Sequence, residues 1–118
     1  MEERSGLQIY LLDQAGGSRR GGISELDQVV ASGTGLAWVL LDYTRDQARA
    51  WLHGNTWLSP VVKQNLADED SRPRCLVSAE GVFLSLRGVN HNRGAEPEDM
   101  VAVRLWVMPN CVVSSKRR

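Results

Sequence analysis

Two stretches in the second half of the chain alternate apolar side chains with others at a period of two. They cover residues 82–87 and 101–108. Successive side chains on a β-strand point to opposite faces, so this spacing predicts strands with two distinct faces. Shorter apolar segments at 75–77 and 111–113 predict two more strands, and the Pro-Asn pair before the last one favours a turn. The second half therefore predicts an antiparallel meander.

The first half carries strand and loop signals of a different kind. The segment 7–12 predicts a strand, and the glycine-rich segment 16–22 predicts a loop. Residues 36–41 form an unbroken apolar run, which is typical of a strand buried on both faces. Glycines at 33–35 are expected to end the element before this strand.

Helices are predicted between these strands. Their expected caps are Ser24, for a helix that extends to about Ala31, then Thr44, and then Ser59 followed by Pro60. Spacings of three and four place Ala48, Trp51 and Leu52 on one face of the second helix and Leu58, Val62 and Leu66 on one face of the third. The expected fold class is α/β, of the α+β kind, with a mixed, largely antiparallel sheet and flanking helices.

Composition limits the classes of function. The chain has 118 residues, with 14 basic and 14 acidic side chains, which suits one domain with its own core. A formal net charge of zero gives no basic field for a nucleic acid. The longest apolar run, of six residues, is too short to cross a bilayer, and no apolar signal segment follows the polar start. We therefore expect a cytoplasmic location, with Cys75 and Cys111 as buried, reduced thiols.

Motifs for catalysis are weak. The segment Gly17–Ser24 resembles a phosphate-binding loop, but Ile23 stands where a lysine is required, so a plain loop is expected. A thiol enzyme could be assembled from Cys75, His53 and Asp42, but no local signature ties these residues together. We expect no catalytic residues and no bound cofactor.

Metal-binding signals are also weak. His53 and His91 lie far apart and no paired cysteines exist, so a structural zinc site is not expected. Two acidic runs are weak candidates for loose cation binding, because carboxylates without a scaffolded geometry hold divalent ions only weakly. The weak metal candidates are Asp68, Glu69, Asp70, His91, Glu96, Glu98 and Asp99.

Arginines are the expected partners of these carboxylates, because bidentate arginine pairs fix loop geometry. The arginines considered are Arg72, Arg74, Arg87 and Arg104, and their expected partners are Asp42, Asp99 and the acidic runs.

The stretch Arg87–Trp106, with the sequence RGVNHNRGAEPEDMVAVRLW, resembles the cytoplasmic domain of CorA-type divalent metal ion transporters, in particular the ZntB zinc transporter branch. Other segments agree in order. They are Leu12-Asp13 with the glycines at 16–17, Trp38–Tyr43 before a helix, and Glu69–Arg74. The resemblance covers most of residues 7–118.

The resemblance implies that residues 1–118 form an N-terminal cytoplasmic funnel domain, a fragment without the stalk and transmembrane helices. Relatives of this kind assemble as homopentamers, with Zn²⁺ as the transported ion and the membrane reached only through the missing C-terminal part. It implies roles in funnel assembly, in the cation environment and in gating. We also expect the loop 88–99 to lie at a subunit or funnel surface, because it is long, polar and flanked by two well-patterned strands. An alternative keeps the fold but makes the domain a regulatory or structural module without a direct metal role. The small thiol enzyme is a third interpretation.

Overall fold

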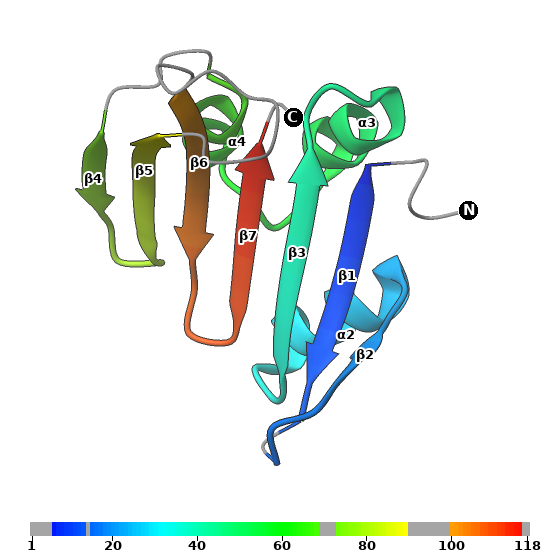
Figure 1. The fold of residues 1–118 in the computed structure, drawn as a ribbon. Coiled ribbons are helices and arrows are strands. Elements are labelled where there is room, and N and C mark those ends of the chain that lie inside the picture. Colours follow the sequence, from blue (N-terminus) through cyan, green and yellow to red (C-terminus); the bar gives the residue numbers. More distant parts are fainter. Residues whose placement is uncertain (1–5, 14, 69–72, 90–99, 117–118) are drawn as a thin grey trace.

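The computed structural model describes residues 6–13, 15–68, 73–89 and 100–116 as a seven-stranded sheet with three helices (Figure 1). Their bounds, in chain order, are β1 Leu7–Leu12, β2 Ser18–Arg20, α2 Ile23–Ser32, β3 Leu36–Asp42, α3 Asp46–Gly54, α4 Pro60–Ala67, β4 Arg74–Val77, β5 Val82–Val89, β6 Met100–Val107 and β7 Cys111–Lys116. The expected α/β class and the late meander β4 to β7 are both confirmed.

The sheet has the order β2-β1-β3-β7-β6-β5-β4, so the last strand of the chain lies at its centre. The β3–β7 pair is parallel and the other neighbouring pairs are antiparallel. Ala37 pairs with Cys111 and Val39 with Val113. This single parallel pair joins the N-terminal three strands to the C-terminal meander, which makes the sheet mixed and largely antiparallel.

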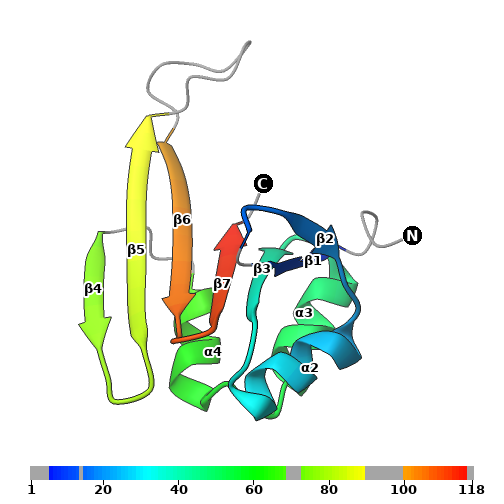
Figure 2. The same cartoon turned by 90° about the horizontal axis from the view of Figure 1, so that it is seen from below.

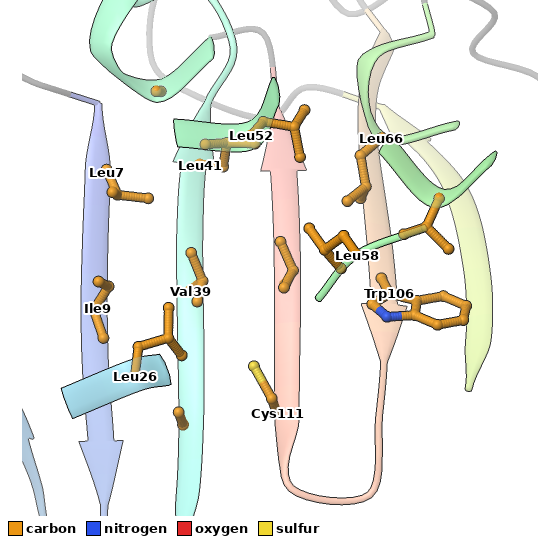
Figure 3. Close-up of a cluster of buried hydrophobic side chains, with 14 of the residues drawn as sticks. Leu7, Ile9, Leu26, Val39, Leu41, Leu52, Leu58, Leu66, Trp106 and Cys111 are labelled. Atoms are coloured by element: carbon orange, nitrogen blue, oxygen red, sulfur yellow. The ribbon is translucent and has the colours of Figure 1, made fainter. Parts of the chain in front are cut away.

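All three helices pack on one face of the sheet, here called the helix face (Figures 1 and 2). Figure 3 shows Ile9, Val39 and Trp106 from three strands pointing into the same core as Leu26, Leu52 and Leu66 from the helices. The shared faces predicted for α3 and α4 are confirmed, because Ala48, Leu52, Leu58, Val62 and Leu66 are buried. Of the four tryptophans, only Trp106 is fully buried in this core, at 4% exposure.

The other side of the sheet, here called the open face, is covered by none of the described residues. Strand β3 alternates between the two sides: Ala37, Val39 and Leu41 are buried, whereas Trp38 is 40% exposed. The expectation that residues 36–41 are buried on both faces is therefore wrong for this chain by itself. The apolar run reflects two apolar faces, of which only one is covered.

Two capping predictions differ from the structure. Helix α2 begins two residues earlier than expected, with Gly22 rather than Ser24 at the N-cap and the Glu25 carboxylate accepting from the Gly22 N–H. Helix α3 has Arg45 rather than Thr44 at its N-cap. The Thr44 hydroxyl donates to Asp42 at 2.6 Å instead. A hydroxyl that could accept a backbone N–H at a helix N-terminus donates to a carboxylate instead when the carboxylate is nearer.

Other capping predictions are confirmed. The Ser59 hydroxyl accepts the Val62 N–H at 3.2 Å, and Pro60 opens α4. Gly33 takes the left-handed conformation that ends α2.

The glycine-rich segment 16–22 was expected to be a loop, but its middle forms the short edge strand β2. Strand β2 pairs with β1, and the Asp13 carboxylate shapes the turn by accepting the N–H groups of Ala15 and Gly17. Cys75 was expected to be buried and is exposed. It lies on the edge strand β4 and, in register with Leu84, points to the open face. Cys111 is buried as expected.

Candidate functional site

Asp68 is the C-cap of α4 and is the one predicted metal candidate that falls within the described residues. Its carboxylate accepts from the Arg74 guanidinium of β4 at 3.2 Å, and the same Arg74 nitrogen contacts the Asn65 side-chain oxygen at 3.3 Å. The guanidinium also stacks over the Phe83 ring, 5.4 Å from its centroid. The predicted pairing of Arg74 with the first acidic run is therefore confirmed, and it ties α4 to the end of the sheet.

Asp42 ends β3 at the edge of the sheet where β7 also ends. Burial acts to raise the pKa of Asp42, but hydrogen bonds from the Thr44 hydroxyl and N–H, with the charges of Arg45 and Lys116, outweigh it and hold the pKa below its ordinary value. The Arg45 Nε lies 4.0 Å from the carboxylate. Within the described residues, the printed partners of Asp42 are its sequence neighbours Thr44 and Arg45 rather than one of the arginines considered, because a tight turn brings them close.

The remaining arginine expectations have mixed outcomes. Arg87 is exposed, whereas Arg104 is 2% exposed and lies on the helix face in register with Ser85 and Ser115. Arg72 and Asp99 fall outside the described residues.

Most of the predicted cation candidates fall outside the part of the chain that the structure describes. These are Glu69, Asp70, His91, Glu96, Glu98 and Asp99, together with most of the loop 88–99. Among the described residues, no group of three or more His, Cys, Asp or Glu side chains is close enough to hold a metal ion. Asp68 and Asp42 belong to separate ion pairs, so each fixes local geometry.

The three residues of the thiol-enzyme interpretation do not come together. Cys75 lies on β4, four strand positions from β3, which carries Asp42. At about 4.8 Å per strand spacing this is a separation of about 19 Å across the sheet. The His53 ring instead lies 3.3 Å from the Tyr43 hydroxyl. Neither Asp42 nor His53 is therefore placed to act as a base for the Cys75 thiol.

The open face carries a groove that the sequence patterns did not predict. It has a volume of about 290 Å³, and Leu40, Val103 and Gln8 lie along it, with Asp42 and Lys116 at one end. Ser114 also lines it and is held between the Trp38 indole N–H, at 3.1 Å, and the Val39 carbonyl, at 3.2 Å. The alternation in β6 predicted which of its residues share a face, but only the pairing of β3 and β6 with β7 brings Leu40 and Val103 to the same groove.

None of the described helices is both long and apolar enough to cross a membrane; the longest, α2, has ten residues. The domain therefore consists of a sheet with three helices on its helix face. Its open face, which carries the groove, is covered by none of the described residues. This architecture recurs in known proteins.

The family model described as CorA-like Mg2+ transporter protein matches residues 33–118. The chain belongs to this family. The zinc transport protein ZntB of Yersinia pestis is 34% identical over 100 residues, which are 84% of this chain and 31% of that protein. The divalent cation transporter CmaX of Pseudomonas aeruginosa is 36% identical over 118 residues, which are 99% of this chain and 36% of that protein.

Solved structures agree with this membership. A structure of full-length CmaX superposes with a TM-score of 0.82 at 37% identity, covering 97% of this chain and 36% of that one. The crystal structure of the ZntB cytoplasmic domain from Vibrio parahaemolyticus has the same fold, with a TM-score of 0.68 at 22% identity. It covers 95% of this chain and 44% of that one. The chain thus spans about a third of the length of the curated relatives it matches.

Proposed function

We propose that residues 1–118 form the N-terminal cytoplasmic part of a divalent-cation transporter of the inner membrane, working as a homopentamer with Zn²⁺ as its transported ion. The observation that carries the proposal is the similarity to full-length CmaX over 97% of the chain, at 37% identity and a TM-score of 0.82. The family is one of ion transporters, and the described residues contribute no bond-making chemistry to this role.

The chain's part in transport is structural and electrostatic. Two acidic runs, at 68–70 and 96–99, raise the local concentration of cations near the inner mouth of the pore. Such an effect depends on ionic strength, because exposed charges are screened over about 8 Å at physiological salt. The ion pair between Asp68 and Arg74 supports this role, because it fixes the position of the first residue of the first acidic run.

The test is zinc uptake by the full-length protein in proteoliposomes that contain a zinc-sensitive dye. The variant neutralises five carboxylates through Glu69→Gln, Asp70→Asn, Glu96→Gln, Glu98→Gln and Asp99→Asn. We expect the initial rate to fall about threefold or more at low ionic strength and the difference to shrink at high salt. The matched control is Glu80→Gln, at an exposed turn between β4 and β5.

Uptake that is unchanged by the five substitutions at low ionic strength would contradict the electrostatic role. That result, with no heat of zinc binding to the wild-type protein at sub-millimolar concentration, would favour the regulatory or structural module. Absence of any divalent-cation uptake by the full-length protein would reject the transporter itself.

A further inference from the structure

Four polar side chains cross the helix face of the sheet in one row, here called the polar row. It consists of Arg74 of β4, Ser85 of β5, Arg104 of β6 and Ser115 of β7, each in register with the next. Ser85 and Arg104 are 0% and 2% exposed. Burying a charge is costly unless a group of opposite charge or a set of hydrogen bonds compensates it. The polar row therefore brings two positive charges, one of them fully buried, to the helix face.

The polar row lies beneath the C-terminal end of α4, and acceptors there are already in use. One Arg74 nitrogen, Nη2, donates to the side chains of Asn65 and Asp68 at 3.3 and 3.2 Å. The Ser115 hydroxyl donates to the Leu66 carbonyl at 3.0 Å. These contacts hold α4 against the sheet.

Two polar groups of the row are buried and have no hydrogen-bond partner among the described residues. They are the Nε of Arg74 and the hydroxyl of Ser85. The two residues are in register on neighbouring antiparallel strands, so their Cβ atoms are about 4.5–5.5 Å apart on the same face. Burial without a partner is costly, because each group loses its hydrogen bonds to water. A third group that bonds both of them would remove this cost.

The donors and charges of the polar row favour an anion as this third group. The Arg74 Nε–H can only donate, and the Ser85 hydroxyl can donate as well. Arg104 adds a positive charge one strand further along, and attraction between charges is strong in a poorly hydrated interior. A water molecule would accept the same two hydrogen bonds, but it would need acceptors for its own protons. A small anion needs none.

We propose that the polar row binds one small monovalent inorganic anion of the halide class beneath α4, held by the Arg74 Nε–H and the Ser85 hydroxyl. The charges of Arg74 and Arg104 supply the electrostatic stabilisation. The anion fixes α4 to β4 and β5, because the same Arg74 side chain holds Asp68 at the end of that helix. The site goes beyond the proposed function, because it concerns an anion inside the domain and not the transported cation.

The test measures amide hydrogen exchange of β5 in the full-length transporter, in sodium bromide and in sodium gluconate at the same ionic strength. An ion that binds only the folded domain slows exchange through unfolding by a factor that grows with its concentration, and gluconate is too large for a buried site. We expect exchange to slow by about tenfold at about 0.3 M bromide, which corresponds to a Kd of about 30 mM.

Ser85→Ala removes one of the two donors, and it should abolish the bromide dependence. Without the anion the hydroxyl has no partner among the described residues, so in gluconate the variant should exchange no faster than the wild-type protein. The matched control is Ser115→Ala in the same row, whose hydroxyl donates to Leu66. It should speed exchange in both salts and keep the ratio between them.

Crystals of the wild-type transporter grown in bromide provide an independent measurement. Anomalous scattering should place one bromide ion within hydrogen-bond distance of the Ser85 hydroxyl. A water molecule or a carboxylate of the chain at that position overturns the inference. Equal exchange in the two salts, or a bromide dependence that survives Ser85→Ala, does the same. Zinc uptake tests the proposed function separately, and none of these outcomes bears on it.

Discussion

The two cysteines differ in their surroundings far more than in their sequence contexts. Cys111 is 2% exposed between Ala37 and the core, and burial raises its pKa to about 12. Cys75 is exposed on the edge strand β4. We expect an alkylating reagent at pH 7.5 to modify Cys75 rapidly and Cys111 slower by on the order of a thousandfold, because Cys111 reacts only through opening of the domain. Mass spectrometry of single-cysteine variants measures both rates, and comparable rates would contradict the burial of Cys111.

Asp42 gives a prediction about pH. Its pKa is below the ordinary value near 3.8, so its hydrogen bonds from Thr44 stabilise the folded state fully above that value. The stabilisation is lost as pH falls through the lower, folded-state pKa. We expect Asp42→Asn to lower the free energy of unfolding at pH 7 by about 1 kcal/mol and to have a smaller effect at pH 2.5, measured by urea denaturation. Equal destabilisation at both pH values would show that the carboxylate charge is not involved.

Single residues also show where reasoning from sequence stops. The partner of Arg74 could be predicted from charge, because Asp68 is close along the chain and the strand that follows α4 returns beside it. The exposure of Cys75 could not, because a strand alternation gives two faces without saying which one meets the helices. Most of the candidate cation residues stay predictions, since they lie outside the described residues.

At the scale of elements, the turn between β4 and β5 depends on a close approach at Gly81. The Gly81 carbonyl accepts both the N–H and the hydroxyl of Ser78. A Cβ atom at this position would lie 2.4 Å from the Val107 carbonyl oxygen. We expect Gly81→Ala to lower the free energy of unfolding by about 1–3 kcal/mol, because β6 must shift to make room.

The matched control is Gly54→Ala in α3, where an added Cβ would meet no atom within 4 Å. It should be neutral or stabilise the domain by up to about 1 kcal/mol. Urea denaturation of both variants makes the comparison, and the opposite order of stabilities would refute the steric argument.

The elements themselves were largely predictable, and their edges were not. The hydrophobic periods of α3, α4, β5 and β6 follow directly from burial on the helix face. The start of α2 differs from the prediction by two residues and that of α3 by one. The Glu25 carboxylate accepts the Gly22 N–H at the start of α2, and the Asp42 carboxylate takes the hydroxyl that the capping rules assign to the start of α3. Strand β2 pairs with β1 because the Asp13 carboxylate shapes the turn between them. The cluster of glycines in this segment predicts a loop and gives no signal for the strand.

At the scale of the whole molecule, the β3–β7 pair is the only direct strand pairing between the two antiparallel parts within the described residues. Cys111 and Ala37 lie in register at this junction, and Cys111 belongs to the common core. We therefore expect a single cooperative transition in urea, with far-UV circular dichroism and Cys111 labelling changing at the same concentration. Exposure of Cys111 at a lower concentration would mean that the two parts separate before either unfolds.

The strand order was beyond the reach of periodicity. The sequence patterns identified six of the seven described strands, β2 being the exception. A parallel partner 76 positions away, as in the contact between Trp38 and Ser114, leaves no local signal. The open-face groove depends on that pairing and was hidden for the same reason.

The central position of β7 also has a consequence for synthesis on the ribosome. Strands β1 and β3 are made early, but β7, which pairs with β3, is the last of the seven described strands to leave the exit tunnel. During that interval the nascent chain exposes an unpaired strand edge with apolar side chains on both faces, at translation rates of about 5–20 residues per second. Chaperones that bind extended apolar segments can therefore bind β3 for several seconds. This interval ends when β7 pairs with β3.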